Sequence, residues 1–171
     1  MSTQDNREYW LRGPLEGIPA LLQPIAHALL QARDEVTKTL EHFPDEKLWE
    51  KPAGSASVGF HLQHLRGVID RLFTYAKNEP LSQPQLAALS LEGKPYEGNE
   101  TVAGLLDAFH QQVEKALQQL KATDASTLTE TRGVGRAKIP STVLGLLFHA
   151  AEHTMRHTGQ LLVTANVVSA G

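Results

Sequence analysis

Three histidines, His149, His153 and His157, stand four residues apart near the end of the chain. In a helix, residues at positions i and i+4 lie one above the other on the same face, so neighbouring pairs could bind one metal ion. A second pair, His61 and His64, lies far upstream in another segment with a helical pattern. Two segments that donate imidazoles to one point could build a three-ligand site with open positions for water or substrate.

A helical projection at ~100° per residue orders the three C-terminal histidines. With His153 at zero, His157 lies at about +40° and His149 at about −40°. The apolar residues of this segment fall between roughly +20° and +100°. His157 therefore lies within the apolar stripe, His153 at its edge and His149 further toward solvent. In the upstream segment His61 lies deeper than His64, but periodicity alone does not choose between them as ligands.

Two further residues near these histidines could take part in chemistry. Glu152 precedes His153, but it projects ~100° away, on the side opposite His157. We therefore expect a solvated or interface carboxylate rather than a general base. His61 could shuttle protons beside a ligand, but packing or hydrogen bonding behind a ligand is the favoured interpretation, because ligating histidines need partners.

The elements that must position these residues are helices. Apolar periodicity predicts four long amphipathic helices and one short one, over about 24–42, 58–78, 83–91, 101–121 and 141–168. Ser57 and Ser141 are the expected N-caps of the second and last long helices. Ser82 and Gln85 have the spacing of a capping box before the short helix. Arg71 projects to the same side of its helix as His64.

Four amphipathic helices of similar length must bury their apolar stripes against one another. We therefore predict an all-α fold, a four-helix bundle with a short extra helix, as a single domain over residues 1–171. The connections are longer than an up-and-down bundle needs, so at least one crossover connection is expected. The alternation of apolar and polar residues around Val134 and Ile139 is too short to predict a strand.

Composition restricts the class of protein. Hydrophobic residues make up 41% of the chain and charged residues 20%, which favours a folded globular protein. A net charge of −3 gives no reason to expect binding to nucleic acid or to an anionic membrane. No apolar run approaches the ~20 residues that span a bilayer, and residues 1–12 lack an apolar signal core. We expect a soluble cytoplasmic protein.

Two segments resemble the signatures of a known family, the DinB/YfiT-like metalloenzyme superfamily. Residues 57–65, SVGFHLQHL, are similar to its second-helix signature. Residues 149–160, HAAEHTMRHTGQ, resemble its last-helix signature, in which H-x-x-x-H is followed by a Gly-Gln pair. Matched residue by residue, the metal ligands of the family fall on His64, His153 and His157. The resemblance covers nearly the whole chain, including the order of the four long helices.

The resemblance implies a bundle that is often dimeric and holds one divalent metal through three histidines and water. The family includes thiol-dependent transferases and isomerases. Three neutral imidazoles leave the charge of the cation unneutralised, which would activate a thiol for transfer or water for hydrolysis. The chain has no cysteine, so a thiol would have to come from a small-molecule substrate. Zn or Ni is the first expectation for the metal, and Mn or Fe would also fit such a site.

Two alternatives to an enzyme remain open at this point. The chain could be a metal-binding or stress-response module without turnover, built on a dimeric helical bundle. It could also be a structural homodimer whose histidines never meet. The first test between these alternatives is whether the histidine side chains converge.

Overall fold

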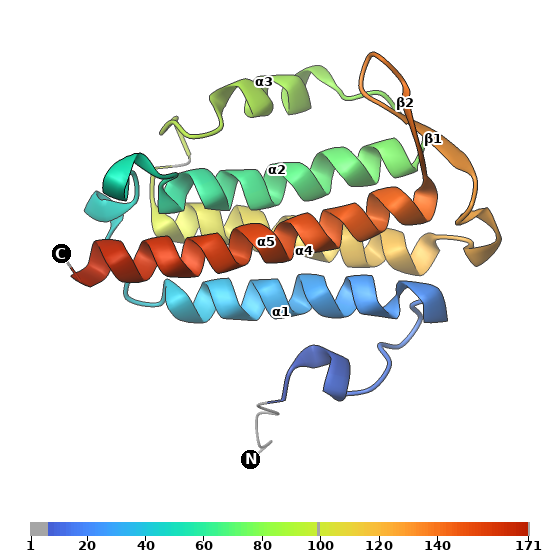
Figure 1. Ribbon diagram of the computed structural model, residues 1–171, viewed down its shortest axis with the longest axis horizontal. Coiled ribbons are helices and arrows are strands. Elements are labelled where there is room, and N and C mark those ends of the chain that lie inside the picture. The colour runs from blue at the N-terminus through green and yellow to red at the C-terminus, as the bar shows by residue number, and fades with distance from the viewer. Residues whose placement is uncertain (1–6, 99, 171) are drawn as a thin grey trace.

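Four long helices lie side by side in the computed structural model, which describes residues 7–98 and 100–170 (Figure 1). The long helices are α1 (Gln23–Thr39), α2 (Val58–Ala76), α4 (Val102–Ala122) and α5 (Val143–Ala170), and the short helix is α3 (Gln83–Leu91). The predicted all-α bundle with a short extra helix is confirmed. Residues 1–6, 99 and 171, which the single-domain prediction includes, lie outside the described residues.

The bundle has a defined order of neighbours. α2 packs against α4 and α5, and α1 packs against the same two helices, whereas contacts between α1 and α2 are few. α1 and α2 therefore lie on one diagonal of the bundle. Apolar side chains from all four helices fill the centre, including the fully buried residues Leu29, Leu62, Ile69, Phe109 and Leu147.

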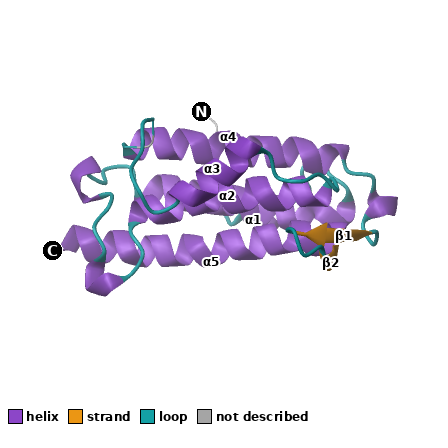
Figure 2. Cartoon of the chain, turned by 90° about the horizontal axis from the view of Figure 1, so that it is seen from above, coloured by secondary structure: helices purple, strands orange, loops and turns teal. Residues whose placement is uncertain are grey.

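The connection from α2 to α4 is the predicted crossover. α3 runs back over α2, so that α4 starts at the same end of the bundle as α2 and runs in the same direction (Figures 1 and 2). The amide of Gln85 fastens α3 to α2 by donating to Asp70 Oδ2 at 3.0 Å and to Thr74 Oγ1 at 2.8 Å. Gln85 also closes the predicted capping box with Ser82.

A small hairpin precedes α5, and here the prediction of no strand was wrong. β1 (Thr131–Val134) and β2 (Ile139–Thr142) pair antiparallel, at the end of the bundle away from the C-terminus (Figure 2). Each strand has four residues, and Gly133 lies opposite Pro140. Gly133 and Pro140 interrupt the alternation of apolar and polar residues in the two strands. The strands pair because a tight turn joins them, which requires no long alternating pattern.

The helix boundaries follow local capping. Ser57 caps α2 as predicted, with its Oγ accepting a hydrogen bond from Phe60 N at 3.2 Å. The prediction of Ser141 as the cap of α5 was wrong, because α5 begins at Val143 and Ser141 lies one residue too early. Thr142 takes that role, and its Oγ1 accepts from Gly145 N at 3.0 Å. α1 ends at Thr39 rather than near residue 42.

Within the described residues, none of the helices combines the length and the apolar character that crossing a membrane would require.

Candidate metal centre

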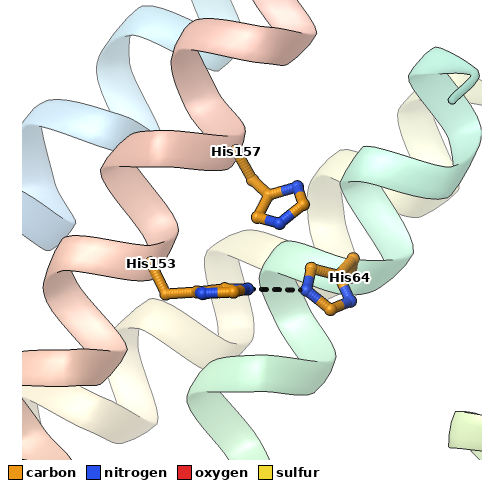
Figure 3. A group of neighbouring side chains, drawn as sticks. All are labelled: His64, His153 and His157. Carbon is orange, nitrogen blue, oxygen red and sulfur yellow. Dashed lines mark hydrogen bonds between the residues drawn. The ribbon is translucent and has the colours of Figure 1, made fainter. Parts of the chain in front are cut away.

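Two adjacent helices bring together the three histidines selected by the sequence. His64 projects from α2, and His153 and His157 project from successive turns of α5 toward it (Figure 3). One ring nitrogen of each histidine lies within 4.8 Å of one from each of the others. The alternative in which these histidines never meet is therefore wrong for the trio.

The spacing of the nitrogens fits a single small cation. His64 Nε2 and His153 Nε2 are 2.9 Å apart. The ring centroid of His157 lies 4.4 Å from that of His64 and 4.7 Å from that of His153. With Zn–N bonds of about 2.0–2.1 Å, two ligand nitrogens are about 2.9 Å apart at a right angle and about 3.4 Å apart at a tetrahedral angle. The three imidazoles could hold a metal ion with small side-chain adjustments.

The second nitrogens of two of these rings already have partners. His64 Nδ1 lies 2.8 Å from Glu92 Oε2, and His157 Nδ1 lies 3.1 Å from His61 Nδ1. Both rings therefore keep Nε2 available for the centre. His153 Nδ1 is buried without a hydrogen-bond partner. His61 takes the position behind a ligand that the sequence favoured, and its side chain is buried.

Glu92 is the residue that sequence reasoning missed. It follows α3 on the crossover connection, and its side chain is 10% exposed. Its Oε1 accepts a hydrogen bond from Arg71 Nη1 at 2.6 Å, while Oε2 faces His64. Burial acts to raise the pKa of Glu92, but the hydrogen bonds from His64 and Arg71 outweigh it and lower the pKa below its usual value. Glu92 is therefore an ionised acceptor.

Burial favours the neutral form of three of these imidazoles, those of His61, His153 and His157. Desolvation, followed by the charge of His64, lowers the pKa of His61 to about 4. Desolvation and then the neighbouring histidines lower the pKa of His157 to about 4, and similar causes lower the pKa of His153. Neutral imidazoles have a free lone pair, which is the form that binds a metal ion.

A second group that could hold an ion combines His149, Glu152 and the shared His153. It is more exposed, because the side chain of His149 is 52% accessible and that of Glu152 is 36% accessible. Glu152 forms ion pairs with His149 and with Arg156, one turn further along α5. This agrees with the expectation of a solvated carboxylate, and it assigns Glu152 to the outer surface of α5.

The lowered pKa values predict that the metal-free protein loses stability in mild acid. His61 and His157 titrate near pH 4 in the folded state, below their ordinary value of 6.5. Both are neutral in either state above about pH 6.5. Between about pH 6.5 and pH 4 the unfolded chain binds protons that the folded protein does not, so the free energy of unfolding falls as the pH falls. The slope is at most about 1.4 kcal/mol per pH unit for each histidine, and solvent screening reduces it.

Urea denaturation of the metal-free protein at several pH values in this window would measure the slope. His61→Leu is expected to make it shallower, whereas His42→Gln, at an exposed histidine, is expected to leave it unchanged. A slope that is the same in the His61→Leu protein would contradict the assignment of the lost stability to this cluster.

Comparisons with known proteins concern the family and the fold of the chain. The family model described as the DinB superfamily matches residues 28–161, which include all the histidines of the cluster. The solved structure of a conserved protein from Enterococcus faecalis is 17% identical to this chain and has a TM-score of 0.70. The match covers 88% of this chain and 98% of the Enterococcus faecalis chain, which shows a shared fold. A search of curated proteins gave no match.

Proposed function

The chain belongs to the DinB superfamily, and from this premise we propose that it is a divalent-metal-dependent enzyme with His64, His153 and His157 as the metal ligands. The observation that carries the proposal is the convergence of three imidazole nitrogens, from two helices, within 4.8 Å. Three ligands leave further coordination positions for a substrate. Zn or Ni is the first choice for the native ion, and Mn or Fe the second, because such nitrogen sites accept several metals.

A divalent cation bound to three neutral imidazoles would supply Lewis-acid activation of a small-molecule thiol or of water. The chain's own residues would orient and shield this centre. Glu92 and His61 hold the rings of His64 and His157 from behind. Phe60 stacks on His64 with ring centroids 5.3 Å apart and planes 13° from parallel, which covers one face of that ring.

Transfer of a small-molecule thiol to an electrophilic carbon is the reaction we favour, and a related hydrolysis is the alternative. Both reactions would use Lewis-acid activation of the nucleophile by the bound cation. The protein has no cysteine, so the thiol must arrive as a substrate. We extend the proposal to a homodimer on the basis of family membership, and analytical ultracentrifugation of the untagged protein would test that part.

A cavity beside the centre is the proposed substrate site. It has a volume of about 660 Å³ and is lined on the α5 side by Arg156, Gly159 and Gln160. His61 also lines it, and His61 contacts His157, so the cavity adjoins the histidine cluster. Its volume is in the range of small-molecule sites. A larger cavity of about 1170 Å³ lies between α1 and α4, but its lining includes neither His61 nor any of the three proposed ligands.

Filling this cavity should separate substrate binding from metal binding. Gly159 lies on the cavity wall, and a Cβ at this position would meet no other atom within 4 Å. Gly159→Leu is therefore expected to fold and to bind metal as the wild type does. Its kcat/KM for a thiol substrate should fall by at least about 10-fold, because the leucine side chain occupies the cavity. Unchanged kinetics in Gly159→Leu would place the substrate elsewhere.

Two measurements test the proposed function. Metal analysis of protein purified without a histidine tag should find about one divalent ion per chain. The metal-loaded protein is then screened with low-molecular-weight bacterial thiols and a chloro-dinitro arene as electrophile. Turnover above the rate without protein supports the enzyme. A bound ion with only background rates across the thiols would favour a metal-binding module instead.

A further inference from the structure

The carboxylate of Glu92 bridges a proposed metal ligand and a partly buried arginine. Its two oxygens lie 2.8 Å from His64 Nδ1 and 2.6 Å from Arg71 Nη1, and the side chains of Glu92 and Arg71 are only 10% and 13% exposed. We propose that Glu92, held by Arg71, is a positioning residue that fixes His64 in the tautomer and orientation required for metal binding. This inference rests on the proposed function.

The chemistry of the hydrogen bond gives Glu92 this role. An ionised carboxylate only accepts hydrogen bonds, so Nδ1 of His64 must carry the proton that the pair shares. In neutral His64 the lone pair is then on Nε2, the atom that faces His153 at 2.9 Å. Arg71 occupies the other oxygen of Glu92 and balances its charge. Glu92 therefore acts through His64 and is not itself directed at the ion.

The backbone beside Glu92 is fastened to α2 by a neighbour of the ligand. The side chain of Gln63 accepts a hydrogen bond from Gly93 N at 2.7 Å and donates one to the carbonyl of Lys94 at 2.9 Å. Gln63 is itself buried. Two consecutive residues of α2 therefore bind the crossover connection. Gln63 binds the backbone of the connection, and His64 binds the carboxylate of Glu92.

A glycine in the middle of α2 makes room for the pair. A Cβ at Gly67 would lie 2.4 Å from Glu92 Oε1 and 2.5 Å from Arg71 Nη1, closer than real Cβ atoms approach. Glycine weakens a helix interior, so its presence here needs a local reason. The space required by the Glu92–Arg71 pair supplies that reason.

The test compares variants by two measurements. The first is zinc affinity, from competition with a chromophoric chelator. The second is the histidine tautomers of the metal-free protein, from ¹⁵N NMR of the imidazole rings. Glu92→Ala is expected to weaken zinc binding by about 10–100-fold and to give His64 a mixture of tautomers. Glu92→Gln keeps an oxygen acceptor and should retain the wild-type tautomer with a smaller loss of affinity. Glu79→Gln, at an exposed carboxylate of the same connection, is the matched control.

Two results would overturn the inference. One is zinc affinity in Glu92→Ala within about threefold of wild type, since loss of such a partner costs more. The other is a wild-type His64 with its proton on Nε2. The NMR measurement uses metal-free protein, so it tests Glu92 even if no ion binds, an outcome that would defeat the proposed function alone. Gly67→Ala should displace the pair and reduce affinity as Glu92→Ala does. If Gly67→Ala fails to fold, the zinc affinity and the His64 tautomer of Glu92→Ala still test the inference.

Discussion

His153→Ala is expected to abolish tight binding of a divalent cation. His153 faces both of the other proposed ligands, with its Nε2 2.9 Å from His64 Nε2 and its ring 4.7 Å from that of His157. Removing a ligand should weaken binding by more than about 100-fold, beyond the cost of losing an outer partner. Isothermal titration of metal-free protein with zinc would measure the change, and metal analysis should show the ion lost on purification.

His149→Ala is the control for this prediction. His149 stands one turn before His153 on α5 and belongs only to the exposed group with Glu152. It is expected to bind zinc like the wild type. If His149→Ala lost the ion while His64→Ala retained it, the ion would belong to the exposed group, and the proposed centre would be wrong.

Phe109→Ala is expected to cause the largest loss of stability among single substitutions in the core. Phe109 lies on α4, is fully buried and is the largest of the fully buried side chains. Truncating a buried phenylalanine costs about 3–5 kcal/mol, because transfer free energy is lost and a cavity remains. That is a large part of the 5–15 kcal/mol by which domains are typically stable. The midpoint of urea denaturation would measure it.

Phe148→Ala serves as the matched control, because this phenylalanine is 61% exposed on α5. A surface substitution of this kind usually changes the free energy of unfolding by no more than about 0.5 kcal/mol. Equal losses in the two variants would mean that the apolar centre of the bundle is not where the structure places it.

Most of the fold could be predicted from the sequence because its helices are long and amphipathic. A period of 3.6 residues sustained over about 20 positions distinguishes a helix from other elements. The capping residues Ser57 and Ser82 added the helix starts. The hairpin before α5 could not be predicted, since its strands are short and Gly133 and Pro140 interrupt their pattern. The hairpin extends to Thr142, so α5 begins one residue later than predicted and Thr142 caps it.

The site could be predicted only in part. Helical projection selected the α5 pair, whereas the choice of His64 over His61 came from the family resemblance, and the structure brings His64 to that pair. Glu92 could not be predicted, because it stands 28 residues from His64 on a connection without periodicity. One signal was present: Arg71 projects to the same side of its helix as His64, and an arginine drawn away from solvent is usually paired with an acidic side chain. Nothing in the sequence identifies which acid that is.

The separation of the helices along the chain also governs when the centre can form during synthesis. His64 and His153 are 89 residues apart, and α5 is synthesised after α1 to α4. A nascent chain that has folded α1 to α4 carries a single member of the trio. The proposed centre can therefore bind an ion only after the ribosome has made the part of α5 that carries His153 and His157.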